Sequence, residues 1–283
     1  MEKKIDFVML VNVNRANPNG DPLGGNRPRT DYNGFGEMSD GCIKRKIRNR
    51  MQDLGHSIFV QMDERADDGF FCLADRAKDL MGKDKDAAIF REKACKKWLD
   101  VRAFGQVFAF KKEGDGNSNG VSIGVRGPVT IHIPVSVAPV DVRQFQITKS
   151  VNGQSEKKDV ISSDRMGNKF FVQHGLYVVR GSISGRLAEK TGFSAADAEV
   201  LKKCLLSLFE NDASSARPDG SMEVVKLYWF EHDSVDGQYP SAAVHRSVKV
   251  AVRDADNLPT CLDDYIITLD KLPGLKVEVL EGR

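Results

Sequence analysis

Basic side chains gather on one predicted helix that directly follows a glycine-rich loop. Residues 39–54 carry five basic residues against two aspartates, a local net charge of +3, and the basic ones are Lys44, Arg45, Lys46, Arg48 and Arg50. The preceding residues 17–26 (NPNGDPLGGN) are too rich in Gly, Pro and Asn for regular structure. Loop amides and helix cations could converge on a phosphodiester chain. A plainer explanation stays open, because a basic helix face is often only a solvated face.

Patterns for catalysis or metal binding are sparse. The five histidines stand alone in the sequence, which predicts no metal site. Residues 181–185 (GSISG) miss the nucleophile elbow, because isoleucine occupies the position that the serine needs. His174 with Arg143 or Lys149 could cleave RNA by acid–base catalysis, but a lone histidine beside basic residues is more often a binding contact. We therefore expect no catalytic residue, no metal and no cofactor.

Composition indicates an ordinary globular chain. Its 283 residues are 41% hydrophobic and 29% charged, enough for one elaborated domain or two small ones. No apolar run of about 18 residues spans a bilayer, and the five scattered cysteines predict reduced thiols in a cytoplasmic protein. The net charge is +2 overall but +4 in residues 141–190 and −3 in residues 253–283. Such a chain could bind a polyanion on one face and dock to its own copies elsewhere.

The elements that must position the basic residues form a recognisable order. Apolar patterns predict strands at 5–11, 129–137, 176–183 and 222–230. One helix is predicted at 39–54. It is capped by Ser39 and buries Ile43, Ile47, Met51 and Leu54, so that its basic residues point elsewhere. Another helix is capped by Ser194 with Asp197. The order strand, helix, strand, strand, helix, strand is typical of the α+β ferredoxin-like or RNA-recognition-motif fold.

Two insertions interrupt this core. The first carries a predicted helix at 86–100 and the polar loop 111–120 (KKEGDGNSNG). The second, residues 139–174, reads as a protruding β-hairpin with a strand at Gln144–Thr148 and a turn at Asn152–Gly153. The aromatic pairs expected on an RNA-recognition sheet are missing, so RNA would have to use a different surface.

Several segments together resemble the Cas-seven (Cas7) family, the repeated RNA-binding backbone subunits of CRISPR surveillance complexes. The segments are 17–22 (NPNGDP), 36–48 (GEMSDGCIKRKIR), 100–105 (DVRAFG), 166–168 (MGN) and 227–233 (LYWFEHD). The resemblance keeps the element order over nearly the whole chain. It is closest to the type I-C branch.

The resemblance implies a single elaborated domain, residues 1–283, in the shape of a hand. An RNA-recognition-like palm would comprise about 1–55, 121–138 and 175–283, helical fingers about 56–120, and a β-hairpin thumb about 139–174. Subunits would stack head to tail along the guide RNA (crRNA), and each thumb would displace guide bases at regular intervals, leaving short runs to pair with a target DNA strand. Partners would be the crRNA, the target strand, copies of the chain, and the large and crRNA-processing, 5′-handle-binding subunits of a Cascade complex.

The same resemblance implies roles for single residues. Lys44, Arg45 and Arg48 would hold guide phosphates, and Thr148 and Met166 would lie near the displaced base, with Met166 as an apolar wedge. The full predicted set of RNA-binding residues is Asn17, Asn19, Arg27, Lys44, Arg45, Arg48, Arg126, Arg143, Thr148, Lys149, Met166 and His174.

Two alternatives stay open. RNA-cutting relatives in type III systems carry a catalytic aspartate in the loop after the first strand, and Asp21 or Asp31 could make this chain a metal-dependent endoribonuclease. Because neither aligns with that acid, we interpret the subunit as non-catalytic. The other alternative is a free-standing RNA-binding module that acts as a monomer.

Overall fold

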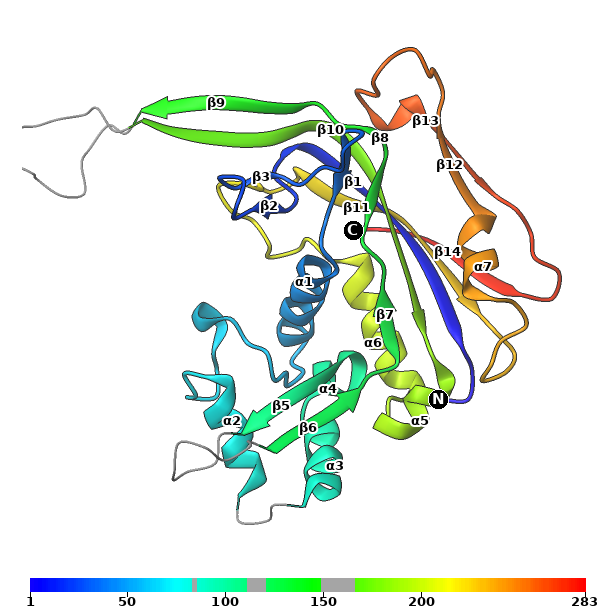
Figure 1. Ribbon diagram of the computed structural model, residues 1–283. Helices are drawn as coiled ribbons and strands as arrows, with labels where there is room; N and C mark the ends of the chain where they lie inside the picture. Colours follow the sequence, from blue (N-terminus) through cyan, green and yellow to red (C-terminus); the bar gives the residue numbers. More distant parts are fainter. Residues whose placement is uncertain (83–85, 111–120, 149–165) are drawn as a thin grey trace, which may run out of the picture.

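The structure, a computed structural model, describes residues 1–82, 86–110, 121–148 and 166–283, and only the backbone of Phe110, Val121 and Met166. A long antiparallel sheet runs through it (Figure 1). At its centre β1 (Ile5–Ala16) pairs with β10 (Met166–Ile183) on one side and β11 (Met222–Glu231) on the other. Around them lie β4 (Phe35–Glu37), β7 (Val129–Ile131), β8 (Val135–Pro139), β9 (Val142–Thr148) and β14 (Lys276–Glu281).

The four core strands that the sequence predicts lie side by side in this sheet. Their order is β11–β1–β10–β7, and each pairing is antiparallel. Helices α1 (Asp40–Asp53) and α6 (Ala195–Leu206) pack on one face of it. The chain is therefore a mixed α/β fold built on a large antiparallel sheet.

Strand β1 is buried on both faces because successive side chains alternate between two hydrophobic clusters. Phe7, Met9 and Val11 join α1 and α6 in one cluster. Val8 and Leu10 join the other, which is formed by α7 (Ser241–Ser247), β12 (Val248–Val252) and β13 (Tyr265–Leu269). The C-terminal segments thus cover the second face, which leaves no open platform there for stacking bases.

Helix α1 begins and ends where its sequence predicts. The Ser39 hydroxyl accepts the Cys42 amide at 3.1 Å, and Gly55 has the positive φ of 82° that a helix terminator adopts. Ile43, Ile47 and Met51 are fully buried, as predicted. Leu54 is 41% exposed and its predicted burial is wrong, because it is the C-cap residue beyond the last buried turn.

Two other predicted elements are each broken in the structure. The strand predicted at 129–137 divides into β7 and β8, because Pro134 has no N–H for the ladder and its carbonyl instead accepts the Met38 amide at 3.0 Å. The helix predicted at 86–100 becomes α3 (Ala87–Lys97) and α4 (Leu99–Phe104), with an extended residue, Trp98, between them. The Trp98 side chain is fully buried, so its packing decides the break.

Some elements were not predicted from the sequence. They are β2 (Gly20–Asp21), β3 (Arg27–Pro28), β4, β5 (Gly105–Phe110), β6 (Val121–Arg126), the 3-10 helices η1 (Asp63–Arg65) and η2 (Leu262–Asp264), α2 (Leu73–Met81), α5 (Gly185–Thr191), α7 and β12. In residues 260–283 the sequence predicts short strands joined at Pro273–Gly274. They are β13 and β14, which pair with β12 and β11 rather than with each other.

A third hydrophobic cluster lies apart from the sheet, and we call it the finger cluster. It is formed by α2, α3, α4 and the hairpin of β5 (Gly105–Phe110) and β6 (Val121–Arg126), around the buried rings of Phe59, Phe90, Trp98 and Phe108. The rings of Phe59 and Trp98 lie 4.7 Å apart, centroid to centroid. Most of the cluster comes from the insertion predicted at 56–120, and β6, which follows that insertion, completes it.

The predicted hairpin at 139–174 has its two strands. β9 pairs with β10 from Thr148–Met166 to Val142–Val172, and these strands project from the body as an arm (Figure 1). The predicted turn at Asn152–Gly153 lies outside the described residues. Because β10 continues into the sheet as a single strand, the arm extends directly from the strand that pairs with β1. The division of the chain into palm, fingers and thumb stays a prediction.

Candidate nucleic-acid interface

The loop after β1 is tied to the N-terminus of α1 by its asparagines. The Asn19 side-chain oxygen accepts the Ser39 amide at 2.8 Å, and the Asn17 side-chain amide donates to the Asn26 carbonyl at 2.7 Å. Asn17 is only 2% exposed. Both predicted RNA-binding asparagines therefore hold the loop in place, and direct contact of either with RNA stays a prediction.

The basic residues of α1 divide into two groups. Lys46 and Arg50 were expected to point away from the core but are buried against the α6 side: Lys46 pairs with Asp212, and Arg50 with Asp53 and Glu210. That expectation is wrong, because acidic partners after α6 compensate both charges. Burial still lowers the pKa of Lys46. Neither residue is available to phosphates.

The other three basic residues of α1 differ in how firmly they are held. Lys44 reaches Asp40 one turn earlier at 2.9 Å, on a partly exposed surface, and lowers the pKa of that carboxyl. Arg48 pairs with the fully buried Asp100 at 2.9 Å. Arg45 donates to the Val60 carbonyl at 2.7 Å, and burial, followed by the nearby Arg48, lowers its pKa to about 10. Of the three, Lys44 has the most exposed partner, so its charge contributes least to holding the fold together.

A cavity brings Lys44 together with Arg126, two predicted RNA-binding residues far apart in sequence. It has a volume of about 510 Å³, and Phe104, Gln106, Ile131 and Leu187 also line it. The Phe104 ring lies under both Lys44 and Arg48, at 6.0 and 5.2 Å from their charged groups. We call this space the Lys44 cavity. It joins two cations to an apolar wall, the combination that holds a nucleotide backbone.

The close chain crossing beside this cavity requires glycine. A Cβ on Gly127 would lie 2.3 Å from the Ala103 carbonyl oxygen, and one on Gly105, whose φ is 78°, would lie 2.4 Å from the Val125 carbonyl oxygen. In the sequence, Gly124, Gly127 and Pro128 directly before the strand predicted at 129–137 indicate a bulge or a close backbone approach, and the structure confirms the close approach at Gly127. The crossing lies next to Arg126, which lines the cavity.

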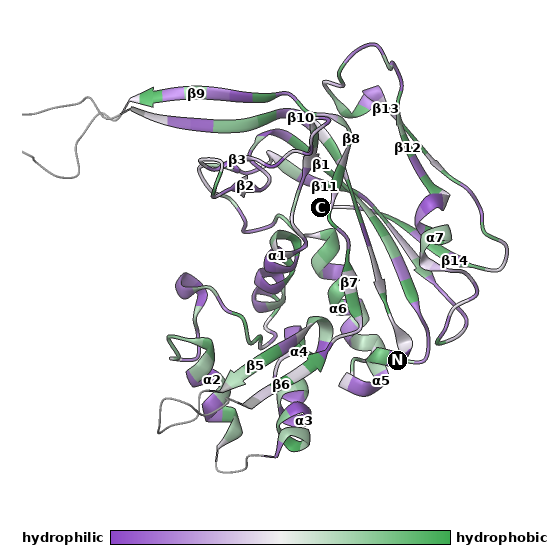
Figure 2. Cartoon of the chain, in the orientation of Figure 1, coloured by the Kyte–Doolittle hydropathy of each residue, from purple (hydrophilic) through white to green (hydrophobic). Residues whose placement is uncertain are grey.

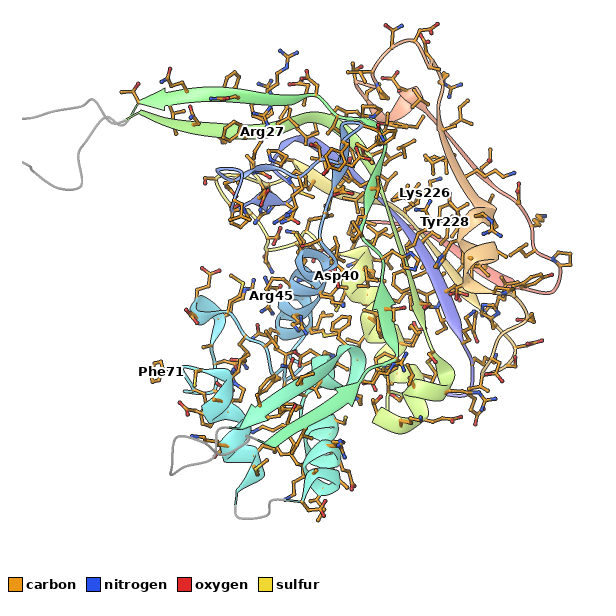
Figure 3. The ribbon with its side chains drawn as sticks, viewed as in Figure 1. Arg27, Asp40, Arg45, Phe71, Lys226 and Tyr228 are labelled. Carbon is orange, nitrogen blue, oxygen red and sulfur yellow. The ribbon has the colours of Figure 1, made fainter. Side chains whose placement is uncertain are left out.

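Two arginines before α1 meet the aromatic residues of the arm. The Arg27 guanidinium lies 5.3 Å from the ring centre of Phe170, and that of Arg15 lies 5.8 Å from Phe171. Figure 3 shows Arg27 beside the arm, with Arg45 and Asp40 on α1. Arg15 was not predicted as a site residue; its signal is a positive φ of 52°, which only the structure gives. It adds a cation where the arm leaves the body.

The remaining predicted contacts lie along the arm or at its base. Arg143 is exposed and pairs with Asp141 at 2.6 Å, and Thr148 ends β9 opposite Met166. His174 is only 7% exposed; burial lowers its pKa, and its ring lies 5.9 Å from that of Tyr265. The side chain of Met166 and the whole of Lys149 lie outside the described residues. The roles of these five residues stay predictions.

Two aspartates that would serve a nuclease are engaged by their own loop. Asp21 pairs with Arg29 at 3.3 Å and accepts the Leu23 amide at 3.2 Å. Asp31 accepts the amides of Asn33 and Phe35 at 2.9 and 2.8 Å, which closes a turn. Within the described residues, no group of three His, Cys, Asp or Glu side chains is placed to hold a metal ion.

Further findings concern the cysteines and membrane segments. All five cysteines are free thiols, and Cys95 and Cys204 are buried. No helix in the described part of the chain is long and apolar enough to cross a membrane.

Comparison with known proteins gives one consistent result. The model of the family described as "CRISPR-associated protein Cas7" matches residues 3–270. A protein of Haloferax volcanii named "CRISPR-associated protein Cas7" is 27% identical over 98% of this chain and 82% of its own length. A chain from a solved "CRISPR RNA-guided surveillance complex" is similar with a TM-score of 0.50 and 16% identity, covering 90% of this chain and 77% of its own. Another, from such a complex described as "pre-nicking", has a TM-score of 0.48, 15% identity and coverage of 90% and 84%.

Proposed function

The chain belongs to the Cas7 family of CRISPR-associated proteins, and we propose that it is a crRNA-binding backbone subunit of a type I-C Cascade surveillance complex. In this proposal copies bind head to tail along the crRNA in the cytoplasm and present it for pairing with target DNA in antiviral defence. The large subunit and the subunit that processes the crRNA and binds its 5′ handle complete the assembly.

One observation carries the proposal: Lys44, whose ion pair with Asp40 is partly exposed, and Arg126 line one cavity next to the loop and helix that carry the family resemblance. Phosphates contribute most of the affinity for a nucleic acid and carry no sequence information. Such a cavity fits a subunit that holds any guide by its backbone.

We infer an RNA-recognition-like palm from the strand order β11–β1–β10–β7 with α1 and α6 on one face. Because α7, β12 and β13 cover the other face, RNA would follow α1 and the base of the arm. The arm corresponds to the proposed thumb. It projects from the body and exposes the Phe145 and Ile147 side chains, 52% and 50% exposed, as a thumb that crosses a neighbour would.

We propose that the subunit is not an enzyme. The structural roles of Asp21 and Asp31 support this, since both carboxylates already hold their own loops. The test incubates wild-type protein with Mg²⁺ or Mn²⁺, bound guide RNA and a complementary RNA. Intact RNA is expected; cuts at regular intervals that Asp21→Ala or Asp31→Ala abolishes would establish the endoribonuclease instead.

A free-standing monomeric RNA-binding module is the third candidate. Light scattering of the protein with and without a long single-stranded RNA distinguishes it, because a backbone subunit forms large assemblies on RNA. A complex that stays at one subunit would favour the module.

A further inference from the structure

The segment before α2 turns one phenylalanine inward and the next one out. Phe71 is 98% exposed, and Figure 3 shows it pointing away from the body. The ring of its neighbour Phe70 lies 5.9 Å from the Arg76 guanidinium carbon. An aromatic side chain this exposed loses favourable burial unless another surface covers it.

A buried arginine fixes the segment that presents Phe71. Arg76 is 3% exposed and donates to the Phe59 carbonyl at 2.9 Å, to Asp68 at 2.8 Å and to the Phe70 carbonyl at 3.4 Å. The hydrogen bond from Arg76 lowers the pKa of Asp68. Phe71 is therefore held in position before any partner arrives, which reduces the entropy lost on binding. Rigid exposed aromatic residues are typical anchors of protein interfaces.

The negative charge of the segment around Phe71 indicates which class of partner would bind there. Residues 63–79 carry six acidic and three basic side chains, a net of −3. Arg65 is paired with Asp53 and Arg76 with Asp68. We call residues 63–79 the acidic tip. A phosphate chain would be repelled here, so a protein surface with a basic hollow is the better match.

The chain itself has a basic groove on the side of the finger cluster opposite the acidic tip. It lies between α3, β6 and the α5–α6 corner, has a volume of about 780 Å³, and we call it the α3–α5 groove. Two acidic residues, Glu92 and Asp197, and five basic ones line it, a net of +3; the basic residues are Arg91, Lys96, Arg102, Arg126 and Lys190. Ala88, Cys95 and Val125 give it apolar wall. In Figure 1, α2 and α5 flank the β5–β6 hairpin from opposite sides.

We propose that the acidic tip of one copy docks into the α3–α5 groove of the next, with Phe71 as the apolar anchor. The proposal rests on the proposed function, because it names a contact that joins successive subunits. A tip and a groove on opposite sides of one chain make a heterologous, head-to-tail contact, which generates an open array when its rotation does not close a ring. The two net charges, −3 and +3, set the orientation of the contact.

The test compares assembly on a long single-stranded RNA with binding to an RNA short enough for one subunit. Three changes are made: Phe71→Ala; a reversed tip, Asp67→Lys with Asp75→Lys; and a reversed groove, Arg91→Glu with Lys190→Glu. All five residues are exposed, so the fold is spared, and Arg91 and Lys190 do not line the Lys44 cavity. Leu258→Ala, at a 54% exposed residue outside the finger cluster, is the matched control.

Each single change is expected to weaken cooperative assembly on the long RNA about tenfold, while affinity for the short RNA stays within about twofold. Combining both reversals in one chain should restore assembly, because each reversed tip then meets a reversed groove. Leu258→Ala should behave as wild type.

Two results would overturn the tip-to-groove contact: assembly of Phe71→Ala as in wild type, or no recovery in the double reversal. A reversed groove that loses short-RNA affinity while Phe71→Ala has no effect would also overturn it, and would make the groove a nucleic-acid surface. Failure of the wild type to bind either RNA refutes the proposed function itself.

Discussion

The Arg48 guanidinium lies 2.9 Å from the carboxylate of Asp100, a side chain with no exposure to solvent. The Asp100 oxygens also accept the backbone amides of Phe59 and Val60, at 2.6 and 3.1 Å. One ion pair thus joins α1 to the start of the finger cluster. A residue predicted only to bind phosphate therefore also holds two parts of the chain together.

The first prediction follows from this pair. Arg48→Ala leaves a buried carboxylate without its cation, which costs about 3–5 kcal/mol of unfolding free energy. Lys44→Ala, at a partly exposed pair on the same helix, should cost less than about 1 kcal/mol. Urea denaturation of both variants measures the difference. Equal midpoints would show that the Asp100 charge is compensated in another way.

The second prediction concerns phosphate binding in the Lys44 cavity. Lys44→Ala and Arg126→Ala should each weaken RNA binding equally for all guide sequences and lower the slope of log affinity against log salt by about 0.7–0.9. Lys249→Ala, at an exposed lysine on β12, should change neither quantity. Filter binding across a salt series measures both. An unchanged slope in the two cavity variants would place the phosphates elsewhere.

The third prediction concerns the arm. Joining Val142 to Val172 through a short Gly–Ser turn removes the arm but keeps the pairing of β10 with β1, which begins at Val172. We expect near wild-type circular dichroism and loss of ordered assemblies in electron micrographs. Replacing all of residues 139–174 should also lower the melting temperature, because Val172 and His174 pair with β1. Ordered filaments from the first deletion would refute the role of the arm.

The fourth prediction concerns Met166, which ends the described arm opposite Thr148. If it wedges against a displaced base, Met166→Gly should keep the fold and much of the RNA affinity, since an apolar contact on a base contributes about 1–3 kcal/mol. Chemical probing of the bound guide should then lose its regular interval, and pairing with target DNA should weaken. A lower melting temperature with the interval intact would make Met166 a packing residue instead.

Local signals in the sequence were sufficient for the core elements. Ser39 and Ser194 cap their helices as expected, because a cap depends on residues within one turn. The four core strands followed from apolar patterns, and all four lie in one antiparallel sheet. Pro134 broke a predicted strand because it has no N–H for the ladder, whereas the burial of Trp98, which depends on long-range packing, broke a predicted helix.

The candidate interface was less predictable, because it depends on contacts between residues far apart in sequence. Whether a basic residue on α1 faces solvent depends on acids far away in sequence, such as Asp212 for Lys46 and Asp100 for Arg48. Periodicity finds the buried stripe but not these partners. The meeting of Lys44 with Arg126 depends on the close crossing at Gly127, which the sequence signalled without showing what it joins.

The most direct test of the backbone-subunit proposal measures how the number of bound subunits depends on RNA length. Native mass spectrometry of the wild type on single-stranded RNAs of increasing length should show complexes that grow by whole subunits at a constant increment of nucleotides. A complex that holds the same number of subunits on every RNA would contradict the proposal.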